Sequence, residues 1–355
     1  MSAGTFFKTF SSSDRTTTRT LLHEAIPITG TLVSGTYAHE GLNDRNANIK
    51  TYSHGMFQSV YDYPYLSSSA NHIFDVTCGF STTNTGDHPS LSSSAATQAA
   101  KKVNIYNQMA QTLVGYDTNG AIRPFDADGD LSAGIKMNNV VFLNFSRLLV
   151  KDEIKKGSFK LDLGHGFTYT SPFSGVSYIT DTGAETSYKV NSPAGEYGLL
   201  KSGSLNVGLI YYQAGIAVLT SSVCHGHDTA LLSTSASADG ANFNDTLHSS
   251  SIDVFADSFR HRISNVSFNN TTELNSTIYF CRANHNEFNY SSNPTYLNGS
   301  KIRVKNENIL APPKSYVTTV GLYSADNELL AVAKLSEPLR KDPSNELTLR
   351  VRLDY

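Results

Sequence analysis

The sequence predicts a mainly β fold: an antiparallel β-sheet or sandwich scaffold that carries two or more helices and an inserted α+β region. Three observations predict this class. The chain has 19 Tyr, 18 Phe and no Trp among many Ser, Thr, Asn and Gly residues, which is typical of β-rich, turn-rich proteins. Short stretches with a period of two alternate with Gly, Pro and Asn. No repeat of fixed length occurs, which argues against solenoids and propellers.

The order of these features along the chain divides it into four segments. Residues 1–20 are rich in hydroxyl groups and predict an extended N-terminal arm that lies on another surface, or else a disordered tail. Residues 21–88 form an N-terminal β region. Residues 89–305 form the central α+β region, and residues 306–355 form a C-terminal β-hairpin docking module.

Two stretches of the central region have helical periodicity. Residues 95–115 are Ala-rich and free of Pro, and Gly115 is placed to end the helix. Their apolar stripe consists of Val103, Tyr106, Met109, Ala110, Leu113 and Val114. The second helix is expected within residues 250–265, where Ile252, Phe255, Phe259 and Ile263 have helical spacing.

Other apolar stretches of the central region predict strands. Residues 140–145 (VVFLNF) predict either a helix or a buried strand, and Phe159, Leu161 and Leu163 alternate as in a strand with one exposed face. Residues 199–223 predict two strands about a Gln-Ala-Gly turn.

The last forty residues have the most regular β pattern of the chain. Val317, Val320 and Leu322 precede a turn at residues 325–327, and apolar residues return after it. Leu347, Leu349, Val351 and Leu353 then alternate with polar residues almost to the C-terminus. This alternation predicts that the C-terminal strand is held in a sheet with one face covered.

Composition excludes several classes of partner. A net charge of −3 on only 17% charged residues provides no basic surface for nucleic acid. No run of about 18 apolar residues is present, so no membrane span is expected, and the N-terminus lacks the apolar stretch of a signal peptide. Three cysteines are too few for a disulfide framework in a chain of this length.

Two motifs carry potential metal ligands. One is CHGHD, with Cys224, His225, His227 and Asp228, although a closed zinc site needs further ligands at recognisable spacing. The other is DADGD, with Asp126, Asp128 and Asp130, which resembles a calcium loop. It has Leu131 where the EF-hand form needs Gly and Met137 at the twelfth ligand position, so an ordinary Asx-rich turn is favoured.

Signatures of catalysis are weak. The chain contains no G-x-S-x-G, P-loop or H-E-x-x-H motif, although His285 and Glu287 form a candidate acid/base pair. Carboxylate pairs for glycoside hydrolysis need no local motif, so that chemistry stays open. We therefore expect no enzyme activity and no cofactor.

The C-terminal stretch YVTTVGLYSADNELLAVAKL, followed by ELTLRV, resembles the module with which tail-fibre proteins of contractile phages dock on the baseplate. The stretches NHIFDVTCGFS, IYNQMAQTLVGYD, LLVKDEIKKGSFKL and FNYSSNPTY are similar to virion structural proteins of marine, T-even-like myoviruses. The resemblance implies a virion structural protein, most closely a baseplate wedge subunit, assembled in the bacterial cytoplasm.

The resemblance also implies the partners. They are other tail or baseplate proteins, tail fibres, and a second copy of this chain in a dimer within the larger complex. The candidate partner-binding residues are Tyr316, Val320, Leu322, Tyr323, Leu330, Val332, Leu349 and Val351. Two alternatives remain: a neck, connector or capsid-decorating virion protein, and a glycan-binding or glycan-degrading tail protein whose aromatic residues stack on sugars.

Overall fold

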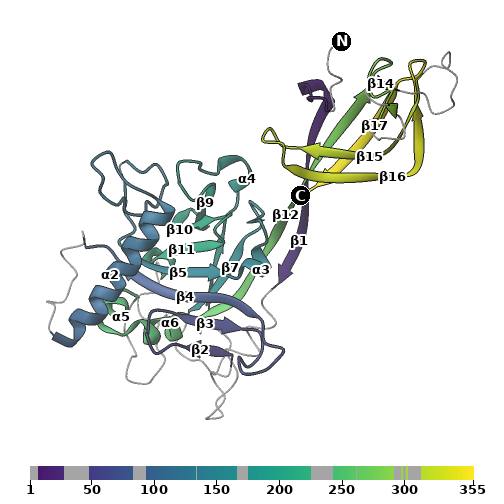
Figure 1. Cartoon of the computed structure of the whole chain (residues 1–355). Coiled ribbons are helices and arrows are strands. Elements are labelled where there is room, and N and C mark those ends of the chain that lie inside the picture. The colour runs from purple at the N-terminus through teal and green to yellow at the C-terminus, as the bar shows by residue number, and fades with distance from the viewer. Residues whose placement is uncertain are drawn as a thin grey trace. The chain divides into compact units, whose positions relative to one another are not determined.

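The computed structural model describes residues 7–27, 48–82, 93–132, 134–165, 175–224, 243–260, 262–291, 297–298, 301–302 and 313–355. The chain divides into two compact units. Leu22–Thr272 form one, here called the core unit, and Met1–Leu21 with Glu273–Tyr355 form the other, called the terminal unit. The N-terminal arm and the C-terminal module therefore belong to one unit. Two long strands, β1 (Arg15–Pro27) and β12 (Ile263–Ala283), contribute residues to both (Figure 1).

The core unit is built on one large antiparallel sheet, which confirms the mainly β class. From β12 the strand order is β7-β8-β9-β10-β11-β5-β4-β3-β2, and β6 pairs with β12 separately. The strands are β2 (Ile49–Thr51), β3 (Gln58–Tyr61), β4 (His72–Phe80), β5 (Asn139–Phe145), β6 (Glu153–Ile154), β7 (Lys160–His165), β8 (Gly175–Thr180), β9 (Tyr197–Ser202), β10 (Leu205–Tyr211) and β11 (Ile216–Thr220).

The centre of this sheet explains its most apolar sequences. Residues 140–145, for which the sequence allowed a helix or a strand, belong to β5, which pairs with β4 on one side and β11 on the other. Val140, Val141, Phe142 and Leu143 are fully buried, so both faces of this strand are covered. Residues 199–223 contain parts of three strands, where the sequence predicted two. β10 and β11 pair about the predicted turn, whose Gly215 is left-handed (φ +68°), and residues 199–202 belong to β9.

Helices pack on the β3–β4 side of the sheet (Figure 1). The predicted Ala-rich helix is α2 (Ser93–Leu113), and the second predicted helix is α6 (Ile252–Arg260), with Phe255 and Phe259 buried. Ile263 is not part of that helix, because it is the first residue of β12. The shorter helices are α3 (Arg147–Val150), α4 (Ala184–Ser187) and α5 (Phe243–Ser249), with 3-10 turns at Ser12–Asp14 and Ser221–Cys224.

Aromatic side chains join the layers of the core unit. The ring centroid of Phe145 lies 5.9 Å from that of Phe74, 5.8 Å from Phe159 and 5.3 Å from Phe268, mostly edge to face. All four rings are buried, and such pairs add about 0.5–1.5 kcal/mol each beyond the area that they bury. No helix among the described residues is long and apolar enough to cross a lipid bilayer.

The terminal unit contains two β layers. In one, β12 lies between β1 and β17 (Leu347–Asp354), and the predicted pairing of the C-terminal strand is confirmed by the antiparallel register from Ser276↔Asp354 to Ala283↔Leu347. The other is the predicted hairpin, which consists of β15 (Ser315–Tyr323) and β16 (Leu329–Lys341). The short strands β13 (Leu297–Asn298) and β14 (Lys301–Ile302) pair with each other in a separate two-stranded sheet.

The described part of the N-terminal arm lies along β12. Lys8 donates a hydrogen bond to the carbonyl of Arg282, and the Phe10 ring lies 5.3 Å from that of Tyr279. Thr17 and Thr277 lie side by side with their hydroxyl oxygens 3.3 Å apart. The described part of the arm therefore follows an extended path on another strand, as one of the two sequence interpretations expected.

Candidate protein-docking surface

The β15–β16 hairpin is a two-stranded sheet with one covered and one exposed face. Its register runs from Ser315↔Lys341 to Tyr323↔Leu329, with irregular steps after Val317 and after Leu322. Leu322 is buried and Val320 is half-buried, opposite Ala331 and Ala333. These residues form the covered inner face.

The opposite face of the hairpin, here called the outer face, is exposed and carries an apolar cluster at its turn end. The cluster consists of Tyr323, Leu329, Leu330 and Val332, each about half exposed or more, with 66% for Leu330 and 58% for Tyr323. Tyr316 is also exposed on this face but lies at its other end, opposite Arg340 and beyond the pair Thr319↔Lys334. Leu330 occupies the extra position created by the irregular step after Leu322. Exposed apolar residues that cluster in this way, rather than singly, are typical of interaction surfaces.

Gly321 leaves room on the outer face for two neighbouring side chains. A Cβ atom at this position would lie 3.0 Å from Cε2 of Tyr323 and 3.4 Å from Cδ1 of Leu329, so both side chains lean over the glycine. A glycine inside a strand weakens the isolated strand and often marks the close approach of another group. Here the Tyr323 ring fills the space, and the result is one continuous apolar surface.

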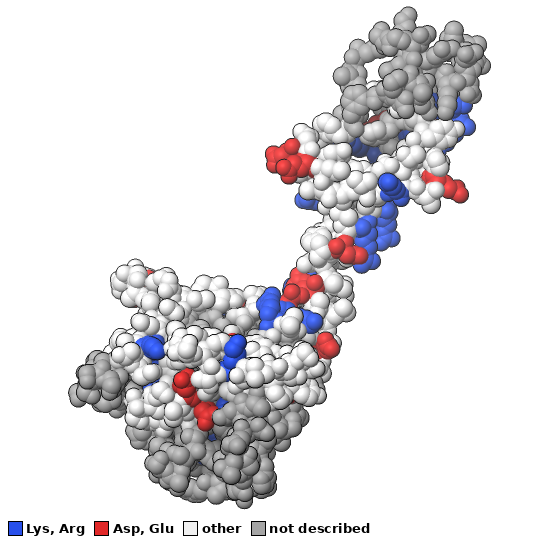
Figure 2. Space-filling view, turned by 60° about the horizontal axis from the view of Figure 1, so that its bottom comes forward, with Lys and Arg blue, Asp and Glu red and all other residues white. Residues whose placement is uncertain are grey.

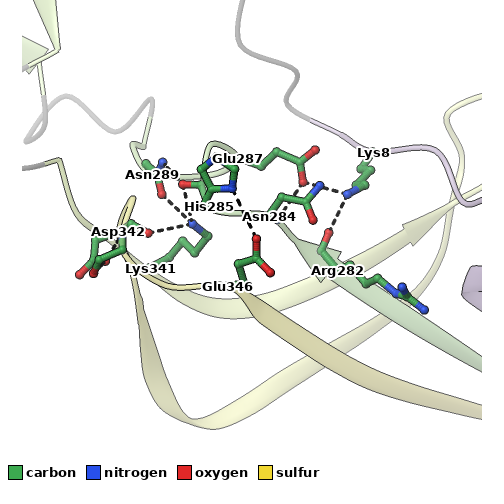
Figure 3. Close-up of polar contacts among 10 residues, drawn as sticks. Lys8, Arg282, Asn284, His285, Glu287, Asn289, Lys341, Asp342 and Glu346 are labelled. Carbon is green, nitrogen blue, oxygen red and sulfur yellow. Dashed lines mark hydrogen bonds and ion pairs between the residues drawn. The ribbon is translucent and has the colours of Figure 1, made fainter.

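A network of polar contacts at the base of the hairpin fixes its position within the terminal unit (Figure 3). The buried Lys341 ammonium donates to the carbonyl of His285 at 3.3 Å, to Oδ1 of Asn289 at 2.7 Å and to the carbonyl of Asp342 at 3.0 Å. The Ser315 hydroxyl donates to the carbonyl of Phe288. The first residue of β15 and the last of β16 are thus both tied to the segment that follows β12.

Four carboxylates of the terminal unit are held in their charged form. Hydrogen bonds from Ser11 lower the pKa of Asp14, and one from Lys8 at 2.9 Å lowers the pKa of Glu287. Hydrogen bonds from Ser344 lower the pKa of Asp342, and one from Ser276 lowers the pKa of Asp354. Each of these four carboxylates accepts hydrogen bonds from neighbouring donors, so all four stabilise the local structure of the terminal unit.

The candidate residues predicted from the sequence do not all share one surface. Tyr316, Tyr323, Leu330 and Val332 lie on the outer face, whereas Val320 and Leu322 point to the inner face. Leu349 and Val351 belong to β17, where they are half-buried opposite Cys281 and Tyr279. The sequence did not single out Leu329 or Lys341. The adjacent leucines at 329 and 330, directly after a turn, were the available signal for the irregular step.

His285 and Glu287 have different partners. Nδ1 of His285 lies 3.4 Å from Oε1 of Glu346, while Glu287 accepts from Lys8 and from the backbone of Asn284 (Figure 3). His285 and Glu346 are both about two-thirds exposed. Because the two side chains bind separate groups on an open surface, this geometry gives no support to an acid/base pair.

The DADGD residues do gather, because one ligand atom from each of Asp126, Asp128 and Asp130 lies within 4.8 Å of the others. The buried Asp126, however, already has a cation: Nζ of Lys136 lies 2.6 Å from its Oδ2. Asp128 and Asp130 accept backbone N–H groups of the same turn, at Asp130 and Ser132. The arrangement is that of the Asx-rich turn favoured by the sequence.

Surface charge is sparse on the described part of the core unit, where Figure 2 shows mostly uncharged surface with isolated basic and acidic groups. The CHGHD residues His225, His227 and Asp228 lie outside the described residues.

No family model, curated protein or solved structure matches this chain significantly.

Proposed function

We propose that this chain is a structural subunit of a contractile-tailed phage virion, in the wedge of the tail baseplate, and that it docks on neighbouring proteins through the outer face of its β15–β16 hairpin. The observation that supports this proposal is the exposed apolar cluster formed by Tyr323, Leu329, Leu330 and Val332. The virion and baseplate setting comes from the sequence resemblance described above.

The packing of the terminal unit supports a docking role. Among its described apolar residues, only Leu322 is buried, whereas the core unit has a large buried apolar cluster. The hairpin has one covered face inside this unit, but a two-stranded sheet gains little stability of its own. A protein partner on the outer face would add the apolar burial that the terminal unit lacks.

The proposed mechanism is mechanical. Neighbouring baseplate proteins and tail fibres contact the terminal unit, while the well-packed core unit serves as a rigid body, and the interfaces rearrange when the tail contracts. A second copy of the chain is one of these neighbours. The apolar outer face fits this role, because the fully buried centre of a permanent interface is depleted of charged residues and rich in aromatic ones.

The location of the chain in purified virions tests the proposal. We expect mass spectrometry to detect it in particles of a phage that encodes it, and immunogold to label the baseplate. Labelling at the head–tail junction would instead favour the neck alternative, and a protein absent from the particles would reject the virion assignment. Turnover of bacterial envelope polysaccharide by the purified chain would favour the glycan-degrading alternative.

Substitutions connect the outer face with assembly. We expect Leu330→Asp and Val332→Asp to prevent incorporation into virions, because each places a charge in the apolar centre of the interface. Val190→Asp is the matched control, because Val190 is an exposed apolar residue (69%) of the core unit. Incorporation of Leu330→Asp at the native level would remove the outer face from the docking surface.

A further inference from the structure

We infer that the outer faces of two hairpins from two copies of this chain pack against each other, antiparallel, about a two-fold axis near Leu330. The inference rests on the docking role proposed above and identifies the occupant of the outer face. Two hairpins in this arrangement form a four-stranded sandwich in which both apolar clusters are covered. Four features of the described residues support it.

The first feature is the amount of apolar surface. Tyr323, Leu329, Leu330 and Val332, at about half exposure or more, provide on the order of 400 Å² per copy. Tyr316 does not contribute, because it lies opposite Arg340, beyond the reach of a second hairpin centred on Leu330. Two copies together bring roughly 800 Å² of apolar surface, and the polar rim extends the interface toward the level of about 1,000 Å² from which specific interfaces begin.

The second feature is chemical self-complementarity. A two-fold interface brings the same patch of both subunits together, so residues near the axis meet their own kind. Leu330 and Val332 carry no charge and make only apolar contacts, and homodimer interfaces are more apolar than other interfaces. An apolar centre of this kind can face a copy of itself without placing like charges in contact.

The third feature is shape. Gly321 lies beneath the Tyr323 ring and the Leu329 side chain, so the middle of the outer face has no projecting Cβ branch of its own. Sheets packed face to face lie about 10 Å apart, with their side chains interdigitated. The level surface around Gly321 permits that spacing for a second, identical hairpin.

The fourth feature is the distribution of charge along the hairpin. Asp326 lies in the turn that closes the hairpin, four residues before Leu330, and Lys334 lies in β16, four residues after Leu330 and roughly 13 Å away at the rise of a strand. Both are exposed. A two-fold axis near Leu330 therefore places Lys334 of one copy opposite Asp326 of the other, twice per dimer. A parallel arrangement would instead bring like charges together.

Sedimentation velocity of the full chain over a concentration series tests the inference. We expect a reversible monomer–dimer equilibrium. Leu330→Lys weakens the dimer by about 100-fold or more, because the substitution acts twice and places two ammonium groups at the axis. Lys334→Glu and Asp326→Lys each weaken it about 10-fold, and the double variant returns to within about threefold of the native affinity.

Arg350→Glu is the matched control for Lys334→Glu, since it makes the same charge change at an exposed position of β17. We expect it to leave the dimer unchanged, and hydrogen exchange of β15, β16 and β17 verifies that the terminal unit is folded in every variant. A chain that stays monomeric, a Leu330→Lys variant that dimerises like the native chain, or a double variant weaker than either single variant would overturn the inference.

Virion incorporation separates this inference from the proposed function. A monomeric chain that is nevertheless found in baseplates would reject self-pairing alone, and would leave a different virion protein as the occupant of the outer face. A chain that dimerises as expected but is absent from virions would reject the virion role alone.

Discussion

The fully buried ammonium group of Lys341 donates a 2.7 Å hydrogen bond to Oδ1 of Asn289, and Asn289 in turn donates to the carbonyl of His285 at 2.7 Å. The end of β16 is thereby connected to the segment that follows β12. A buried charge is costly unless it is well hydrogen-bonded, and here three oxygen acceptors surround the ammonium. The position of the outer face depends on this contact.

We therefore expect Lys341→Met to loosen the hairpin. The substitution leaves Oδ1 of Asn289 without its donor, whereas the carbonyls of His285 and Asp342 each keep a second donor, so we expect a cost of about 1–3 kcal/mol. Backbone amides of β15 and β16 should exchange with solvent roughly 30-fold faster or more, as measured by hydrogen exchange with mass spectrometry. Arg350→Met, an exposed change in the same unit, should leave exchange unchanged. Equal exchange in both variants would show that Lys341 does not hold the hairpin.

The two units should respond to acid in opposite directions. In the terminal unit, Asp14, Glu287, Asp342 and Asp354 have pKa values below the ordinary 3.8 for Asp and 4.5 for Glu, because hydrogen-bond donors favour their charged forms. Their stabilisation is present above the ordinary pKa values and is lost as the pH falls through the lowered values. We expect the terminal unit to become protease-sensitive over that range.

Two carboxylates of the core unit, Asp181 and Asp253, have the opposite shift. Burial raises the pKa of Asp181 and of Asp253, so their protonation in acid is easier in the folded state than in the unfolded one. Protonation of these groups therefore does not destabilise the core unit as the pH falls. Glu287→Gln should reduce the acid sensitivity of the terminal unit. Simultaneous unfolding of both units in acid would contradict this prediction.

Asp181 organises a turn of the core unit, and we expect Asp181→Asn to destabilise it by about 2–3 kcal/mol. The buried carboxylate accepts the backbone N–H groups of Gly157 at 2.7 Å and Phe159 at 3.0 Å, and the Tyr212 hydroxyl at 3.0 Å. An amide can offer only one oxygen, so its NH2 group must face one of these donors.

Tyr212→Phe provides the graded comparison for Asp181→Asn. It removes one hydrogen-bond donor to the Asp181 carboxylate, which keeps its two backbone donors, so we expect the free energy of unfolding to fall by about 1 kcal/mol. Urea unfolding monitored by circular dichroism measures both variants. An Asp181→Asn variant with the same free energy of unfolding as the native chain would show that a water molecule or a rearranged turn satisfies the third donor.

Local periodicity predicted the elements that depend on neighbours in sequence. The stripe from Val103 to Val114 identified α2, the alternation from Leu347 to Leu353 identified β17, and the turn at Asp326 identified the hairpin. Long-range pairing was not visible, because nothing in residues 7–20 specifies β12 as the strand on which they lie. The division of the chain into units follows from that pairing.

The two faces of the hairpin were likewise only partly predictable. From the sequence we placed Val320, Leu322, Tyr323 and Leu330 in one set of partner-binding residues. The apolar residues of a strand can be recognised in the sequence, but the face that the rest of the protein covers cannot. The irregular step at Leu330 shifts the alternation, so Leu329 and Leu330 are both exposed. Lys341 gave no signal at all, since its burial depends on acceptors that lie about fifty residues away in sequence.

Gly79 sets the distance between α2 and the sheet, and Gly79→Ala should destabilise the core unit by about 1–3 kcal/mol. A Cβ atom at this position would lie 2.7 Å from the carbonyl oxygen of Lys102 and 2.9 Å from the backbone nitrogen of Tyr106. Both atoms belong to the helix backbone, so the whole helix must shift, whereas a flexible side chain could rotate away.

Urea unfolding measures the loss of stability in Gly79→Ala. The shift of the helix would also disturb the contacts of Lys102 to Leu247 and Ser250. Val190→Ala, an exposed change in the same unit, should stay within about 0.5 kcal/mol of the native stability. A Gly79→Ala variant as stable as the native chain would show that α2 is not packed against β4 this closely.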